Sequence, residues 1–535
     1  MSDDQVNPQQ VTRYALEGRV VTMNPSFTVL DKGTVYVDGG RIVSVVPTGA
    51  PQPPGFQDAP VIGTRGTIYP GLIDLHNHLS YDALTLWRVP ELYTNRDQWG
   101  RHPDYRKLIS GPMTVLGKTP GYVEAVVRYV ECKCLLGGVT TAQGIALFSN
   151  QGITRYYRGV VRNVEETGED DLPDAATKIS DVEAENAEKF LERLQGSSCL
   201  LLHLSEGTDE RAREHFLALR LANGTWAITP SLAGIHCVAL EPGDFDVLAE
   251  NGGSMVWSPL SNLQLYGQTA DVAAAKTAGV RIGLGSDWSP SGSKSLLGEL
   301  KVARIVVAER DIGFSDREIL AMATRDAAEI LNWGEALGSI EAGKRADLLV
   351  VYGRSTDPYA GLLEAGETHI SLVVIDGVPR VGNERLMSSF GPWTERWRVE
   401  SAERVLNLSQ ESADPAVGAL TLREARDRLR DGLANLPELA RELEQMAPAV
   451  RAAGPQWSLV LDHEEPLDTA IRPHFGEESA TRLAEVMVAS QALSELLIPL
   501  ELDPPTVSDD RAFFGRLSEE TNLPDYVSEG LPALF

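Results

Sequence analysis

Histidine side chains follow short apolar runs in this sequence, in positions where they could bind a metal ion. In Gly71-Leu-Ile-Asp-Leu-His-Asn-His78, an apolar run ends in two histidines separated by one residue. Residues i and i+2 of an extended strand point to the same side, so both imidazoles would converge at the end of the strand. Imidazole nitrogens are common ligands of zinc and other first-row metals. Paired histidines also occur on surfaces and in satisfied cores, so the pair alone leaves the metal site open.

Three later segments place polar side chains in the same kind of position. Cys199-Leu-Leu-Leu-His203 ends in a histidine with Glu206 three residues on, and Ala233-Gly-Ile-His236 ends in another. Gly283-Leu-Gly-Ser-Asp287 ends in a carboxylate. If these were separate core residues, each buried imidazole would need its own hydrogen-bonding partner. One shared metal centre is the simpler interpretation, and it is the one we favour.

The segments between these residues predict a scaffold of parallel strands. Short apolar runs alternate with helical stretches, a pattern typical of strands joined by crossover helices. In barrels of this kind, active sites lie at the carboxyl ends of the strands, where these polar residues occur. Strands are expected at residues 71–75, 139–142, 159–164, 175–179, 199–202, 226–229, 254–257 and 280–284, and helices at 182–194 and 210–221.

The regions on either side of these strands differ from them. Residues 13–45 are rich in β-branched residues and turns, and a similar pattern returns at residues 347–352 and 371–378. The pattern alone leaves open whether these segments form one small domain. Beyond about residue 385, charged amphipathic segments predict a mostly helical extension with a short strand at 457–461. We expect this extension to pack on the barrel or on a second subunit and to contribute no metal ligand.

Composition excludes several classes of partner. The net charge of −28 argues against binding to a nucleic acid, whose phosphates favour basic surfaces. The chain has only 4 cysteines, which is too few for a disulfide framework and favours a reducing compartment. The sequence begins with neither a basic nor an apolar stretch, and it contains no apolar run of about 18 residues. We therefore expect a cytoplasmic protein without a membrane partner.

The order of the polar residues resembles that of the amidohydrolase superfamily. The motifs His76-x-His78, His203-x-x-Glu206, His236 and Asp287 are similar to its branch of cytosine and guanine deaminases, triazine hydrolases and imidazolonepropionase. Further matches are Gly137-Gly-Val-Thr-Thr141, Ser258-Pro-Leu-Ser-Asn-Leu-Gln-Leu265 and Gly338-Ser-Ile-Glu-Ala-Gly-Lys-Arg-Ala-Asp347. The resemblance covers roughly residues 13–385. It implies an α/β fold with a (β/α)8 TIM-type barrel at 69–341, a composite β-sandwich-like domain at 13–68 plus 342–385, and a helical extension at 386–535.

The resemblance also implies roles for the site residues. His76, His78, His203 and Asp287 would hold one divalent metal, with zinc expected and iron as the alternative. Asp287 would accept a proton from the attacking water, and Glu206 would carry it to the substrate nitrogen. His236 would hydrogen-bond the water or the developing oxyanion. The alternative for Glu206 is a carboxylate stabilised at the start of a helix.

Members of the superfamily with two metals use a carbamylated lysine from the fourth strand. Lys178, in Ala175-Ala-Thr-Lys-Ile179, lies near that position. The His203-x-x-Glu206 pattern is the single-metal one, so we expect Lys178 to be solvated.

Evidence on the substrate is limited to two loops at the same end of the barrel. The loop after His78 carries Tyr81, Arg96 and Trp99, and Lys294 follows Asp287. These aromatic side chains could stack on a flat ring and the cations could bind an anionic group, or all could be ordinary packing. We predict hydrolysis of a C–N bond in a small polar molecule, either deamination of a heterocycle or opening of a cyclic amide. The alternatives are a two-metal hydrolase of linear amides or dipeptide-like molecules, and a retired barrel that only binds ligands. The sequence leaves open whether the chain forms a homo-oligomer.

Overall fold

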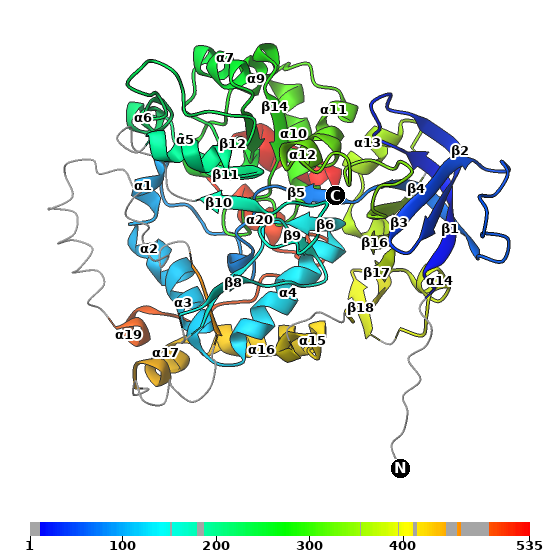
Figure 1. The fold of residues 1–535 in the computed structure, drawn as a ribbon. Coiled ribbons are helices and arrows are strands. Elements are labelled where there is room, and N and C mark those ends of the chain that lie inside the picture. The colour runs from blue at the N-terminus through cyan, green and yellow to red at the C-terminus, as the bar shows by residue number, and fades with distance from the viewer. Residues whose placement is uncertain are drawn as a thin grey trace.

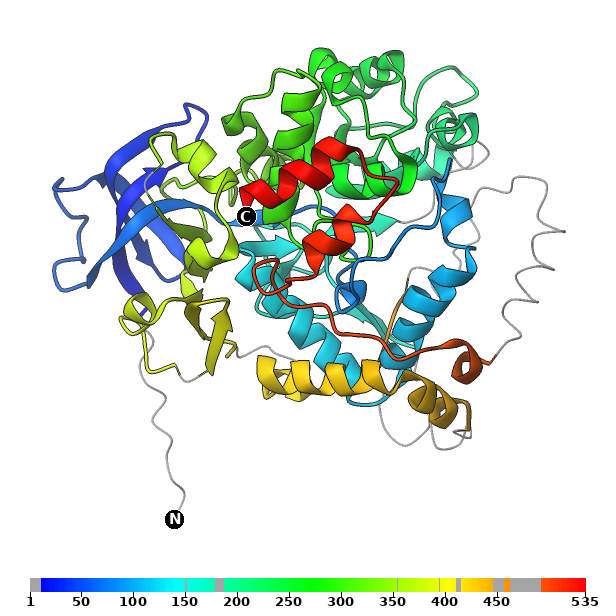
Figure 2. The same ribbon diagram turned by 180° about the vertical axis from the view of Figure 1, so that it is seen from behind.

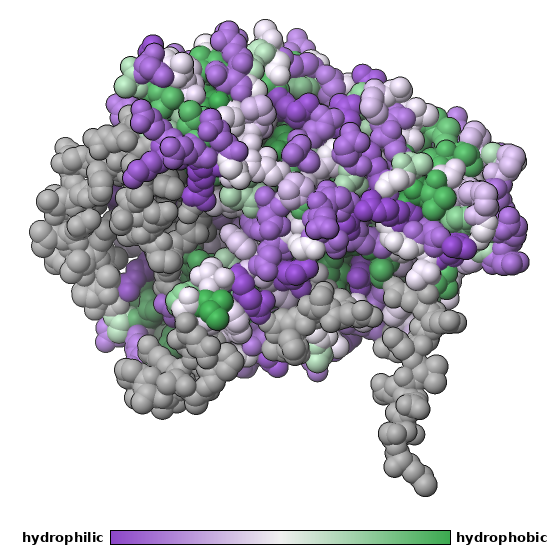
Figure 3. All heavy atoms as spheres, viewed as in Figure 1, coloured by the Kyte–Doolittle hydropathy of each residue, from purple (hydrophilic) through white to green (hydrophobic). Residues whose placement is uncertain are grey.

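The computed structural model describes residues 11–149, 152–178, 187–353, 355–393, 395–409, 415–445, 457–461 and 492–535. Figure 1 shows a group of parallel strands surrounded by helices, with a mixed sheet to one side and the helices of residues 415–445 along the lower edge. Hydrophilic residues cover much of the face in Figure 3, in keeping with the net charge of −28. Over the described ranges, every helix is too short or too polar to cross a membrane.

The mixed sheet combines strands from both flanks of the chain. It has 9 strands in the order β18-β19-β17-β16-β15-β4-β1-β2-β3. The N-terminal β4 pairs antiparallel with β15, from Pro70 opposite Leu348 to Gly66 opposite Tyr352. The sheet continues past residue 385, because β19 pairs with β17 and β18 pairs with β19. The bounds are β1 Arg13–Val21, β2 Val29–Asp38, β3 Arg41–Pro47, β4 Val61–Pro70, β15 Leu348–Tyr352, β16 Ile370–Ile375, β17 Val378–Gly382, β18 Glu395–Val399 and β19 Ala402–Leu406.

Eight parallel strands lie in two further sheets, of orders β5-β6-β9 and β10-β11-β12-β13-β14. Backbone hydrogen bonds join the two sheets at both edges: Ala175 N–H donates to Val164 O at 2.8 Å, and Leu75 N–H to Leu284 O at 3.2 Å. The strands therefore close into a ring. Their bounds are β5 Leu72–Asp74, β6 Val139–Ala142, β9 Arg162–Asn163, β10 Ala175–Lys178, β11 Cys199–Leu204, β12 Leu232–His236, β13 Ser254–Trp257 and β14 Arg281–Leu284.

The ring strands overlap the predicted ones with one exception. The strand expected at 226–229 is wrong. Trp226 makes only an isolated bridge to Arg220, and its ring lies 5.1 Å from that of Phe216. The strand that joins the ring is β12, which begins after Pro230 and is buried throughout. Strands covered on both faces are continuously apolar, which is the pattern that predicted the others.

Helices lie between and after the ring strands. The first group connects β5 to β6, and α5 to α9 separate the later strands. Residues 182–186 of the helix expected at 182–194 lie outside the described part, and the rest of that range lies in α5. The helix expected at 210–221 ends at Leu217. The bounds are α1 Arg96–Trp99, α2 Pro103–Tyr105, α3 Gly111–Lys118, α4 Tyr122–Leu136, α5 Ala187–Gln195, α6 Glu210–Leu217, α7 Pro242–Glu250, α8 Pro259–Tyr266, α9 Val272–Ala278, α10 Leu296–Glu309, α11 Asp316–Met322, α12 Arg325–Ile330, α13 Pro358–Leu363 and α14 Glu384–Met387.

The C-terminal extension packs along the ring rather than standing apart from it. Helix α16 lies against α4, where Gly432 closely approaches Tyr122. Leu502 forms a bridge to Leu84. Helix α21 lies beside α10 and α20 lies beside α21, and both cross the face of the molecule seen in Figure 2. Its bounds are α15 Pro415–Gly418, α16 Leu422–Ala434, α17 Leu436–Gln445, β20 Trp457–Leu459, α19 Leu493–Leu496, α20 Phe513–Ser518 and α21 Asp525–Gly530; β20 pairs with β7 Ala146–Ser149, which pairs with β8 Thr154–Tyr156.

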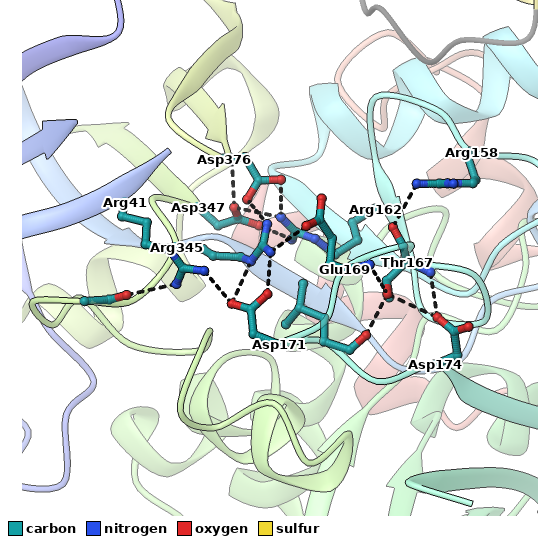
Figure 4. Close-up of polar contacts among 12 residues, drawn as sticks. Arg41, Arg158, Arg162, Thr167, Glu169, Asp171, Asp174, Arg345, Asp347 and Asp376 are labelled. Atoms are coloured by element: carbon teal, nitrogen blue, oxygen red, sulfur yellow. Dashed lines mark hydrogen bonds and ion pairs between the residues drawn. The ribbon is translucent and has the colours of Figure 1, made fainter. Parts of the chain in front are cut away.

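A set of ion pairs joins the ring to the mixed sheet (Figure 4). Arg162 of β9 binds Asp347 at 3.2 Å and Asp376 at 2.7 Å. Arg345 binds Asp376 at 2.9 Å and Asp171 at 3.2 Å. We call these five residues the junction network. It lies at the beginning of β5, because Gly71 N–H donates to the carbonyl of Asp347 at 2.9 Å.

Candidate active site

The predicted metal ligands converge at the carboxyl ends of the ring strands. His76 and His78 follow β5, His203 lies in β11 and Asp287 follows β14. The ring of His76 lies 4.8 Å from that of His78 and 4.6 Å from that of His203. Asp287 Oδ1 lies 3.1 Å from His76 Nε2 and 3.5 Å from His78 Nε2. His236 completes the group, with its ring 5.1 Å from that of His76. These side chains can hold a metal ion.

Two of the histidines are oriented by amide side chains behind them. His76 Nδ1 and Gln143 Oε1 lie 2.9 Å apart, and His236 Nδ1 and Asn262 Oδ1 also lie 2.9 Å apart. An amide oxygen only accepts, so each Nδ1 carries the proton and each Nε2 presents a lone pair. His76 Nε2 is buried and has no hydrogen-bond partner among the described residues, although it faces Asp287. A buried acceptor left without a donor fits a metal ligand.

The electrostatics of the cluster also fit metal binding. Burial, reinforced by the positive charge of Arg96, holds the pKa of His203 well below its ordinary value. Burial also lowers the pKa of His236. Burial opposes ionisation of Asp287, but the positive charge that His76, His236 and His78 carry when protonated outweighs it, so the pKa of Asp287 is lower than usual. Neutral imidazoles and an ionised carboxylate are the forms that bind metal.

The backbone at the ligands is held in an unusual conformation. His236 and Asp287 have φ of 70° and 64°, a region that non-glycine residues occupy only when surrounding contacts compensate. The buried carboxylate of Asp74 supplies such contacts. It accepts from Ser286 N–H at 3.1 Å and from Asn77 Nδ2 at 3.3 Å. Asp74 therefore ties the end of β5 to the end of β14, where the ligands begin.

Glu206 lies beside the cluster and is 4% exposed. Its Oε1 accepts a hydrogen bond of 2.7 Å from the Tyr266 hydroxyl. Its Oε2 lies 3.8 Å from His236 Nε2 and 3.7 Å from an Arg96 guanidinium nitrogen. Helix α6 begins only at residue 210 and is capped by Asp209, whose side chain accepts from the backbone. Glu206 is therefore not a helix-start residue, and a carboxylate in this position can exchange protons with a bound molecule.

Aromatic residues from two loops cover the cluster. The ring of Trp288 lies 6.0 Å from that of His78 and 5.4 Å from that of Tyr81. Trp99 lies 5.7 Å from Trp288, and its indole N–H donates to the Tyr266 hydroxyl at 2.9 Å. The structure thus brings the predicted substrate residues Tyr81, Trp99 and, through Glu206, Arg96 to this site. The aromatic faces of Trp288, Tyr81 and Trp99 can enclose a flat ring.

The prediction for Lys294 is contradicted by its contacts. Lys294 Nζ donates to Asp503 Oδ1 and to Asp510 Oδ2, each at 2.7 Å. Its side chain is 2% exposed, so the ammonium is engaged by carboxylates of the C-terminal extension and is not presented to a ligand. Lys178 lies in β10, but its side chain is outside the described part of the chain.

Several residues of this site were missed by the sequence analysis. Gln143 directly follows the buried strand β6, which is the same signal that identified the histidines. Asn262 belongs to the quoted segment 258–265 but received no role, and its contact with His236 joins residues 26 apart. Tyr266 and Trp288 have no local signal, because only the fold brings them to Glu206 and His78.

Comparisons with known proteins give the relatives of this chain. Residues 201–379 match the model of the amidohydrolase family. Over 426 residues, the chain is 28% identical to the 5-methylthioadenosine/S-adenosylhomocysteine deaminase of Desulforudis audaxviator, covering 70% of this chain and 95% of that protein. The chain therefore resembles the amidohydrolase family, as its motifs predicted. The 5'-deoxyadenosine deaminase of Methanosarcina mazei is 22% identical over 450 residues, covering 74% of this chain and 96% of that protein.

A solved structure has the same fold. The atrazine chlorohydrolase of Arthrobacter aurescens TC1, complexed with zinc, superposes with a TM-score of 0.53 and 22% identity, covering 70% of this chain and 96% of the other. This likeness implies a TIM-type barrel, in agreement with the ring of parallel strands. The predicted class of activity is confirmed: the chain is a metal-dependent hydrolase of C–N bonds other than peptide bonds.

Proposed function

We propose that this protein is a one-zinc deaminase that replaces the exocyclic amino group of an adenine-type ring with oxygen. The observation that supports this most directly is Glu206, held by Tyr266 beside His236 and the metal ligands. Deamination requires a proton on a ring nitrogen and another on the departing ammonia, and a buried carboxylate can carry both. The two relatives that the chain matches over nearly their whole length are named for substrates that contain adenine.

His76, His78, His203 and Asp287 are the proposed ligands of the zinc ion. Three neutral imidazoles and one carboxylate suit zinc, and iron is the alternative. Bound there, zinc would lower the pKa of a water molecule towards about 7 and so provide a nucleophile near neutral pH. We expect about one metal ion per chain, held by the barrel of residues 69–341, with the composite sheet and the helical extension outside the ligand set.

The remaining chemistry falls to side chains of this chain. Asp287 accepts the proton of the attacking water. Glu206 receives this proton and delivers it to the ring nitrogen. The second proton of the water, lost as the carbonyl forms, follows the same route to the amino group, which leaves as ammonia. His236 Nε2, whose lone pair is free because Nδ1 donates to Asn262, accepts a hydrogen bond from the O–H of the entering water, whose oxygen becomes the carbonyl of the product. Water supplies the oxygen and one C–N bond breaks. Trp99, Trp288 and Tyr81 would enclose the flat ring, and the negative net charge disfavours phosphorylated substrates.

The test is ammonia release by the zinc-loaded protein. The panel contains adenosine derivatives with uncharged 5' groups, the corresponding 5'-phosphate, guanine, cytosine, an aminotriazine and a cyclic amide. We expect the highest kcat/KM for the uncharged adenosine derivatives. If no aminopurine releases ammonia, the proposed substrate class is wrong.

Glu206→Gln tests the proposed proton carrier. The variant should keep zinc and fold but lose roughly 10²-fold in turnover, since glutamine cannot exchange a proton near neutral pH. The matched control is Glu214→Gln, an exposed residue of α6, which should retain full turnover. Full activity of Glu206→Gln would contradict the mechanism.

A further inference from the structure

The C-terminal extension inserts two carboxylates into a buried cluster of charges. Asp503 accepts from Lys133 Nζ at its Oδ2 and from Lys294 Nζ at its Oδ1, each at 2.7 Å. Lys294 also binds Asp510 at 2.7 Å. All four residues are 5% exposed or less. We call them the extension network. Buried charges of this kind are stable only as a complete set, because removal of one partner leaves another unpaired.

The network contacts the segments that follow two of the proposed metal ligands. Lys133 Nζ also donates to the Asp82 carbonyl at 2.7 Å and to Ser289 Oγ at 2.9 Å. Ser289 N–H in turn donates to Asp82 Oδ1 at 2.7 Å. Asp82 follows His78 by four residues, and Ser289 follows Asp287 by two. A single ammonium group therefore joins the chain after His78 to the chain after Asp287.

The backbone of the extension docks at the same place. Asp503 N–H donates to the carbonyl of Ala83 at 3.0 Å, and Leu502 bridges to Leu84. The carbonyl of Asp503 accepts from the Tyr129 hydroxyl of α4, the helix that carries Lys133. Both the backbone and the carboxylate of Asp503 are therefore held by hydrogen bonds, beside the loop that begins at His78.

We propose that Asp503 is a positioning residue for the metal site. Its carboxylate neutralises Lys133 and Lys294 and thereby fixes the segments that set the directions of His78 and Asp287. The metal site of the ring is then complete only when residues 500–510 are docked. This inference rests on the proposed zinc site, and it assigns a function to an extension that supplies no ligand itself.

Asp503→Asn is the direct test, because asparagine keeps the size and one acceptor but removes the charge. The matched control is Asp347→Asn, a buried carboxylate of the junction network that is paired with Arg162. Zinc affinity is measured by competition with a chelator, and stability by urea unfolding. We expect Asp503→Asn to bind zinc about tenfold more weakly, the scale for losing an outer partner of a metal ligand. Asp347→Asn should change zinc affinity less than twofold.

The outcomes separate the two proposals. If Asp503→Asn loses stability but binds zinc as tightly as the wild type, the extension is only an anchor and the inference is overturned. If the wild type binds no zinc, the proposed function fails first. If Asp503→Asn does not fold, hydrogen exchange of the wild type decides: zinc must slow amide exchange in residues 500–510 as well as in 79–89. Unchanged exchange in 500–510 also overturns the inference.

Discussion

Strand β5 has a buried charge network at each end, and the two networks differ in what they hold. At its beginning, the junction network pairs Arg162 with Asp347 and joins the ring to the mixed sheet. At its end, the extension network is built around Lys133, which also binds Asp82 and Ser289 behind the metal ligands. In barrels, the amino ends of the strands serve stability and the carboxyl ends serve catalysis. We therefore expect similar ion pairs to have different consequences according to the end of the strand at which they lie.

The choice of cation follows the same division. Arginine, with its planar fork, binds several carboxylates at once in the junction network, where Arg345 contacts Asp171 and Asp376. Lys133 presents a compact ammonium whose three donors reach two separate loops and the extension. The arginine pairs suit a rigid junction between the ring and the mixed sheet. The lysine suits a point at which three chain segments converge.

The largest effect is expected at the ligands themselves. Asp287→Asn removes both a ligand and the proposed base, so zinc content should fall and turnover should drop by about 10³-fold or more. Zinc content is measured by elemental analysis, and turnover by ammonia release. The comparison variant Glu206→Gln should lose turnover only. If Asp287→Asn retained zinc and full turnover, the carboxyl end would not be the catalytic end.

A smaller effect, of a different kind, is expected at the other end of β5. Asp347→Asn leaves Arg162 with one carboxylate fewer in a buried position, which should lower the free energy of unfolding by about 3 kcal/mol. Urea unfolding measures this change. Asp38→Asn is a suitable control, since Asp38 also pairs with one arginine but is about one-third exposed, and it should cost less than about 1 kcal/mol. A loss of zinc affinity in Asp347→Asn would remove the distinction between the two networks.

The sequence predicted the parts of this arrangement that depend on local pattern. Apolar runs ending in polar residues identified the ring strands and the ligands, because a buried strand and its exposed end differ in composition over a few residues. The strand expected at 226–229 was wrong, since an apolar run before Pro230 is instead packed by Phe216.

The local pattern could not predict contacts between residues that are far apart in the sequence. Lys294 and Asp503 are 209 residues apart, and only the docked extension shows that the lysine is occupied. The sequence alone made Lys294 resemble a substrate residue because it follows Asp287 in a polar loop. The same applies to Tyr266, which reaches Glu206 across 60 residues.

The last expected effect depends on pH and concerns a buried carboxyl at the catalytic end that belongs to neither network. Glu299 of α10 accepts from Leu260 N–H at the start of α8, the helix that carries Asn262 and Tyr266. Burial raises the pKa of Glu299 from 4.5 to about 8. The folded protein therefore keeps Glu299 protonated, whereas the unfolded chain loses this proton above pH 4.5.

The contribution of Glu299 to stability is thus fully present below pH 4.5 and is lost progressively as the pH rises to about 8. Glu299→Gln has no proton to lose, so its free energy of unfolding should rise relative to that of the wild type between pH 5 and pH 8. Urea unfolding at several pH values measures this difference, with Glu309→Gln, an exposed residue of the same helix, as the control. A difference that stays constant with pH would mean that Glu299 is ionised in the folded protein, and that the catalytic end tolerates a buried charge without a cation beside it.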